Sequence, residues 1–263
     1  METEKQKAFA KFWNEIPERR RKVLVERAYM AFRNVRNKQI EILRELKRSK
    51  NFTKNGRFTY FFVVVESFWR DADFALALGK KNHSHYATYP VRTMMEKLLK
   101  ILWFTKQTPE IQDTIIKKEL LYGCYLFHKM EQEAGRTGEE FEKRYGEINH
   151  HFNGEVLPPI NSVKADVFKI FESYKILCQK SGLIDATTLY NSYRHLSGLP
   201  HGDILSIFRI GDEEREEYRR VMMLAVRFSI EMLKITDLQI VRATKNEVAS
   251  AIERADKITS GLA

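Results

Sequence analysis

The chain has 263 residues, of which 43% are hydrophobic, 30% are charged and 12% are aromatic. This composition excludes a disordered protein and indicates a soluble one with a bulky core, larger than one typical domain and short for two. Two cysteines exclude a disulfide framework, the amino-terminal residues carry no apolar export signal, and the most apolar run, residues 58–69, is too short to cross a bilayer. We therefore expect a cytoplasmic protein with no membrane partner.

The positive charge of the chain is concentrated at its amino-terminal end. Residues 1–57 contain 17 Lys and Arg against 7 Asp and Glu, whereas the remainder contains 28 of each, so the whole formal net charge of +10 lies in the first fifth of the chain. Such a basic surface attracts polyanions, nucleic acid before acidic membrane, or an acidic partner; alternatively, it is a solvated face that aids solubility. The side chains predicted to bind nucleic acid are Arg19, Arg20, Arg21, Lys22, Arg27, Arg33, Arg36 and Lys38.

Apolar residues recur at helical spacing along most of the chain, in segments separated by Pro, Gly and polar residues. Pro90 should begin one helix, Gly79 should end another, and the polar residues 135–155 should form an excursion or mobile loop. Helices are expected over residues 2–13, 18–50, 58–78, 91–105, 110–133, 162–179, 185–196, 212–239 and 244–258. With no convincing strand, the pattern predicts an all-α protein in which a basic helical extension, residues 1–57, packs on a bundle of residues 58–263.

Rare and reactive side chains gather in residues 190–203, which read Tyr-Asn-Ser-Tyr-Arg-His-Leu-Ser-Gly-Leu-Pro-His-Gly-Asp. Pro200 lacks an N–H and disfavours helical geometry at the residue before it, so a helix entering this stretch should end shortly before the proline. The bend would let Arg194 and His201 address one phosphate, Arg as a fork of donors and His as a proton carrier near neutral pH. The alternative is an ordinary helix end, where Arg194 suits the helix dipole and His201 bonds a loose carbonyl.

Two segments resemble the HEPN superfamily, and most closely bacterial HEPN-like domains of uncharacterised function. One is the expected helix pair of residues 61–105, with Ala-Leu-Gly at the end of the first helix and Arg92-Thr-Met-Met-Glu96 in the second; the other is residues 193–202. The family's motif, an Arg followed by four to six residues and a His, maps onto Arg194 and His201 at the upper limit of its spacing. The similarity covers roughly residues 58–238 and leaves out the basic amino-terminal helix.

This resemblance implies an HEPN-like up-and-down helical bundle that pairs as a homodimer, with two Arg–His motifs in one cleft. For active members it implies metal-independent RNA cleavage without a cofactor, often by a toxin or defence protein, and hence a cognate antitoxin or regulatory protein as a partner. Other members are inactive binding modules. The function predicted first is therefore an RNA endonuclease. The alternatives are a catalytically inactive helical module that binds RNA, a nucleotide or a partner protein, and a purely structural or oligomeric role.

The predicted catalytic residues are Arg194 and His201. RNA carries its own nucleophile, so His201 would move a proton at the 2′-hydroxyl or the 5′-oxygen, and Arg194 would stabilise charge on the phosphorus. Tyr193 or Ser197 would hold the phosphate. His195 adds a second titratable ring, for which packing or solvent exposure is favoured over catalysis.

Two further residues are predicted to support this site from the preceding helix pair. Arg92 and Glu96 lie four positions apart and therefore share one helix face. They would orient Arg194 as a buried polar pair beside it. The alternative is a surface ion pair that contributes little to stability.

Overall fold

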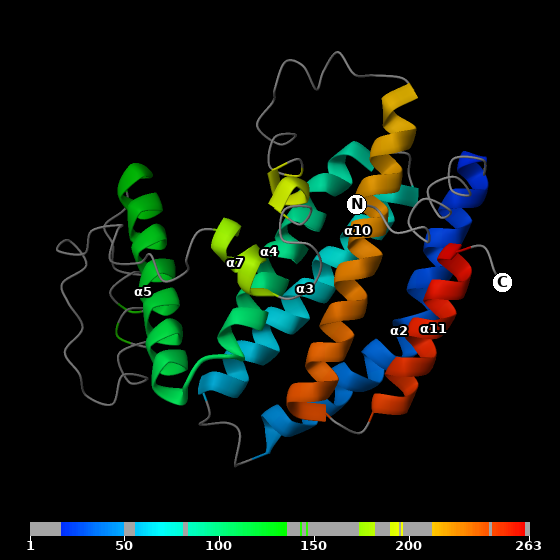
Figure 1. The fold of residues 1–263 in the computed structure, drawn as a ribbon. Helices are drawn as coiled ribbons and strands as arrows, with labels where there is room; N and C mark the ends of the chain where they lie inside the picture. Colours follow the sequence, from blue (N-terminus) through cyan, green and yellow to red (C-terminus); the bar gives the residue numbers. More distant parts are fainter. Residues whose placement is uncertain are drawn as a thin grey trace.

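The computed structural model describes residues 17–49, 56–80, 84–135, 143, 146, 174–181, 190–194, 196, 212–241 and 244–260. Helices occupy almost all of these residues and no strand occurs among them, so the all-α prediction is confirmed, and the helices form a bundle (Figure 1). In chain order they are α2 (Glu18–Arg48), α3 (Gly56–Lys80), the 3-10 turn η1 (Ser84–Ala87), α4 (Thr88–Phe104), α5 (Pro109–Glu133), α7 (Tyr174–Ser181), α10 (Asp212–Thr236), the π-helical turn η6 (Asp237–Val241) and α11 (Lys245–Ser260). Residues 190–194 and 196 are also helical. The helix expected at 2–13 lies outside the described residues, as do most of the 135–155 excursion and residues 162–173.

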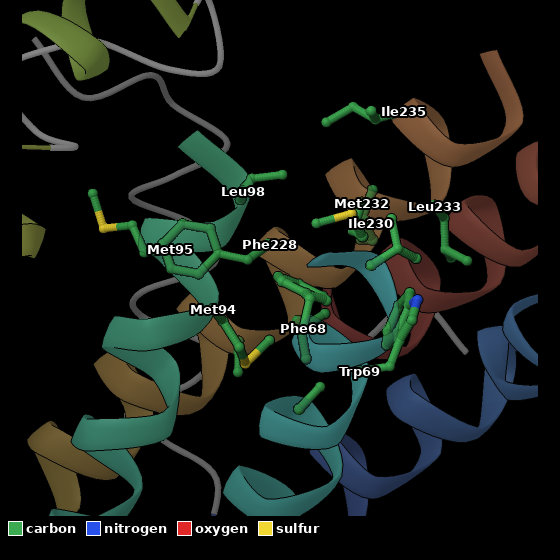
Figure 2. Packing of buried hydrophobic residues seen from close by; sticks show 14 of the residues in the cluster. Phe68, Trp69, Met94, Met95, Leu98, Phe228, Ile230, Met232, Leu233 and Ile235 are labelled. Carbon is green, nitrogen blue, oxygen red and sulfur yellow. The ribbon is translucent and has the colours of Figure 1, made fainter. Parts of the chain in front are cut away.

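The pair α3 and α4 forms the centre of the bundle. The two helices pack on each other and on α10, and α3 also contacts α2 and α5. Buried residues recur every three or four positions along α4, which places them on one side of the helix. Figure 2 shows side chains of α3, α4 and α10 gathered in one apolar cluster, among them Phe68, Trp69, Met94, Met95, Leu98, Phe228 and Met232.

The basic helix α2 belongs to the same hydrophobic core. It packs against α11, α10 and α3, and its buried residues include Ala28, Phe32 and Leu43. The ring of Phe32 lies 6.2 Å from that of Trp69 on α3, within the range of aromatic pairs. The amino-terminal part of the chain thus contributes apolar surface to the bundle as well as positive charge.

The structure differs from the sequence prediction in the roles of Pro90 and Gly79 at helix ends. α4 begins at Thr88 rather than after Pro90, which is tolerated because the first N–H groups of a helix have no partner within it. α3 continues through Gly79 to Lys80, so the prediction that Gly79 caps this helix is wrong. The glycine that turns the chain is Gly135, which follows α5 with a φ of 66° and donates its N–H to the carbonyl of Gln132 at 3.1 Å.

A buried polar network joins α2 to the carboxyl-terminal helices. The side-chain amide of Gln39 donates to the carbonyl of Leu233 and to Thr244 Oγ1, both at 3.1 Å. Thr244 in turn donates its backbone N–H and its hydroxyl to Asp237 Oδ1, at 3.1 Å and 2.5 Å. Gln39 and Thr244 are completely buried, so these hydrogen bonds satisfy groups that water cannot reach.

Candidate functional site

The helical segment that carries Arg194 is anchored by its apolar residues. Leu196 is completely buried in the core, and Tyr190 and Tyr193 pack against that core while remaining half-buried. These three residues recur every three positions, so they occupy neighbouring places on one side of a helix. Arg194 is exposed, and its guanidinium is therefore presented to solvent by a segment whose other side is fixed.

Helix α4 supports this segment through an arginine. Arg92 Nε donates a hydrogen bond to Glu96 Oε1 at 2.9 Å, and both side chains are 23% exposed. The guanidinium carbon of Arg92 lies 5.6 Å from the centre of the Tyr193 ring, which is within cation–π distance. Tyr193 stacks in turn on Tyr190, with ring centres 6.3 Å apart and planes 16° from parallel. Glu96, Arg92, Tyr193 and Tyr190 thus form a continuous row of contacts from α4 to residues 190–194.

The environment of Arg92 keeps its guanidinium charged. Partial burial acts to lower the pKa of Arg92, but the hydrogen bond and the negative charge of Glu96, followed by contributions from Tyr193, outweigh it and raise the pKa above its usual value. The result is a guanidinium that stays positively charged beside the Tyr193 ring. The charge of Arg92 therefore lies against Tyr193, the residue before Arg194.

The structure describes four of the residues predicted for the site, Arg92, Glu96, Tyr193 and Arg194, and brings the first three into contact. Arg92 and Glu96 form the expected pair, and the partner of Arg92 on the neighbouring segment is Tyr193. Among the described residues, this pair reaches the segment that carries Arg194 through the contact of Arg92 with Tyr193. The remaining predicted residues, His195, Ser197 and His201, lie outside the described residues.

A second polar cluster on α4 was not predicted. Asp71 of α3 accepts hydrogen bonds from Thr93 Oγ1 at 2.6 Å and from Lys97 Nζ at 2.5 Å, and Lys97 also donates to Ser67 Oγ at 2.7 Å. The signal in the sequence was the spacing of Thr93 and Lys97, which lie four residues apart and therefore share one face of the helix. These bonds clamp α4 against α3 beside the Arg92–Glu96 pair.

A further polar cluster attaches α5, which stands at one edge of the bundle (Figure 1). Glu119 of α5 accepts hydrogen bonds from Lys100 at 2.9 Å and from the Tyr60 hydroxyl at 3.3 Å. Burial raises the pKa of Tyr60, and the charge of Glu119 and the hydrogen bond to it raise this pKa further. Tyr60 therefore stays a neutral donor, which suits a structural bond.

The α2 residues that were predicted to bind nucleic acid, and whose side chains are described, divide into two groups. Arg20, Arg27 and Arg33 are exposed, and none of them pairs with a carboxylate among the described side chains. Arg36 instead binds Asp73 of α3 at 2.5 Å and lies over the Trp69 ring, and Lys38 binds Glu247 of α11 at 2.5 Å. The predicted residues Arg19, Arg21 and Lys22 belong to α2, but their side chains are not among those described.

Comparisons with family models, with curated proteins and with solved structures found no match to this chain. Within the described residues, no helix has both the length and the apolar character needed to span a bilayer. In the same part of the chain, no three His, Cys, Asp or Glu side chains are grouped as metal ligands.

Proposed function

We propose that the protein is a metal-independent RNA endonuclease in which Arg194 and His201 are the catalytic pair. The observation that carries the proposal is the exposed guanidinium of Arg194 on a segment held from behind by Arg92 and Tyr193. Catalysis of phosphoryl transfer depends on positioning and on stabilisation of charge. An arginine that is accessible on one side and supported on the other meets both requirements.

In the proposed reaction the 2′-hydroxyl of RNA attacks the adjacent phosphorus and the bond to the 5′-oxygen breaks. His201 takes the proton from the 2′-hydroxyl or delivers one to the leaving 5′-oxygen. Arg194 binds the oxygens on which negative charge accumulates, in a geometry that a planar guanidinium provides and an ammonium does not. The products are a 2′,3′-cyclic phosphate and a 5′-hydroxyl.

The test is cleavage of end-labelled RNA in EDTA by the wild-type protein, Arg194→Ala and His201→Ala. We expect each substitution to lower the rate by about 10²- to 10⁴-fold. Arg254→Ala is the matched control, because it removes an exposed arginine from α11, outside the site. Equal cutting by all four proteins would dismiss Arg194 and His201 as catalysts.

The same proposal includes the oligomeric state of the enzyme, its location in the cell and its regulation. The active form is a cytoplasmic homodimer that acts as a toxin or defence ribonuclease and is held in check by a cognate antitoxin or regulatory protein. Sedimentation of the active protein tests the dimer, and a monomer that cuts RNA at full rate would contradict it. Expression in cells tests the toxicity, which Arg194→Ala should abolish.

A second candidate function is a catalytically inactive helical module that binds RNA. The observation that favours it is the group of exposed arginines on α2, Arg20, Arg27 and Arg33, which lack carboxylate partners among the described side chains. This function requires salt-dependent RNA binding without new RNA ends. The appearance of cyclic-phosphate ends that depend on Arg194 would exclude it.

A further inference from the structure

Two exposed tyrosines, Tyr86 and Tyr89, precede the Arg92–Glu96 pair in the chain. Tyr86 lies in η1 and is 61% exposed, and Tyr89 lies at the start of α4 and is 60% exposed. Tyr89 is the only exposed residue of α4, since all the others are buried or half-buried. η1 runs directly into α4, so Tyr86, Tyr89 and Arg92 follow one another at intervals of three residues.

This spacing places the three side chains in a row. Residues three apart are neighbours on an α-helix and eclipse each other in a 3-10 helix. With a rise of about 1.5 to 2.0 Å per residue, successive members of the row are separated by about 4.5 to 6 Å along the axis. The distance exceeds the spacing of about 3.4 Å per nucleotide in a stacked strand, so the two rings suit bases that have been separated from each other.

The row continues into the candidate site. Its third member, Arg92, already packs against Tyr193, which stacks on Tyr190 and precedes Arg194. A single exposed tyrosine is ordinary on a protein surface. Here the exposed rings of Tyr86 and Tyr89 are followed by the guanidinium of Arg92, which contacts the residue next to the exposed Arg194. Aromatic rings next to positive charge are the combination that binds single-stranded nucleic acid, through stacking of bases and attraction of phosphates.

We propose that Tyr89, with Tyr86 beside it, stacks on unpaired bases of RNA next to the phosphate that Arg194 binds. Tyr89 is thus a residue that selects single-stranded over duplex RNA, because bases within a duplex have no free face to offer the ring. This inference takes from the proposed function only that the ligand is RNA, and it does not require that the protein cleaves it. Tyrosines also anchor protein interfaces. If these two tyrosines bind a protein instead, Tyr89→Ala will leave the affinity for single-stranded RNA unchanged.

The test is binding of a fluorescein-labelled, single-stranded RNA of about 12 nucleotides, methylated at every 2′-oxygen so that it cannot be cut. Fluorescence anisotropy gives Kd for the wild type, Tyr89→Ala, Tyr89→Phe and Tyr122→Ala. We expect Tyr89→Ala to weaken binding by about 5- to 150-fold, the range for loss of one stacked base, and Tyr89→Phe to retain wild-type binding. Tyr122→Ala is the positional control, because it removes an exposed tyrosine from α5.

A duplex RNA of the same length completes the test, and its Kd should not change in Tyr89→Ala. Unchanged binding of the single strand by Tyr89→Ala would overturn the inference, as would an equal loss in Tyr122→Ala or for the duplex. Because the probe cannot be cut, the outcome is independent of catalysis. If the protein binds RNA through Tyr89 but never cleaves it, only the proposed nuclease function is contradicted. If the protein cleaves RNA and Tyr89→Ala does not change binding, only this inference is contradicted.

Discussion

The exposed arginines in the first half of α2, Arg20, Arg27 and Arg33, allow a quantitative test of RNA binding by this helix. Changing Arg20, Arg27 and Arg33 together to Gln removes three positive charges and retains residues that suit a helix. For a single strand, each neutralised phosphate contributes about 0.7 to the slope of log Kobs against log salt concentration. If each arginine contacts one phosphate, the slope becomes shallower by about 2, which removes about a 20-fold difference in affinity between about 50 and 200 mM salt.

The measurement is fluorescence anisotropy of a labelled single-stranded RNA across this salt range. The matched control changes Lys129, Arg227 and Lys245 to Gln, since all three are exposed and lie on α5, α10 and α11. It removes the same total charge and should retain the wild-type slope. Equal changes in both triple variants would mean that RNA responds to net charge alone. An unchanged slope in the α2 variant would show that this helix contacts no phosphates.

Three further substitutions test the site, the core and the buried thiol of Cys178. Glu96→Gln should lower RNA cleavage by up to about 100-fold through loss of the Arg92 orientation, and an unchanged rate would show that the pair does not act on the site. Phe32→Ala should cost about 3–5 kcal/mol in urea unfolding, against under about 0.5 kcal/mol for the exposed Phe74→Ala; similar losses would contradict the packing described. Burial raises the pKa of the Cys178 thiol to about 11 from a usual value of 9.0, so the folded state keeps a proton that the unfolded state loses between these values. Wild-type stability relative to Cys178→Ala should therefore be constant below pH 9.0 and fall as the pH rises to about 11, whereas a rise would refute this assignment.

Local periodicity predicted most helices to within a few residues. α4 and α5 each have apolar residues at helical spacing and a proline in the first turn. Both signals lie within a short stretch of sequence, so these two helices could be predicted. The sequence placed the end of α3 at Gly79, but the helix continues to Lys80. A glycine ends a helix in this way when the chain adopts a left-handed conformation at it. That conformation occurs at Gly135 and not at Gly79.

The candidate site was predictable where it depends on neighbours in sequence. The Arg92–Glu96 pair follows from a spacing of four residues. The contact of Arg92 with Tyr193 was not predicted, because the pair was expected to orient Arg194 and Tyr193 was expected to hold the phosphate. The carboxylate partners of Arg36 and Lys38 lie 37 and 209 residues away in the chain. They result from the packing of α2 on α3 and α11, which periodicity within one helix does not specify.

The buried amide of Gln39 has a consequence for the opposite side of α2. Hydrophobic contacts are less directional than hydrogen bonds, so they specify the position of this helix along its axis less sharply. A displacement by one turn, about 5.4 Å, would strand the amide and its partners Leu233 and Thr244 in hydrocarbon without hydrogen bonds. The position of α2 along its axis is therefore set on its buried side, and with it the positions of the arginines on its exposed side.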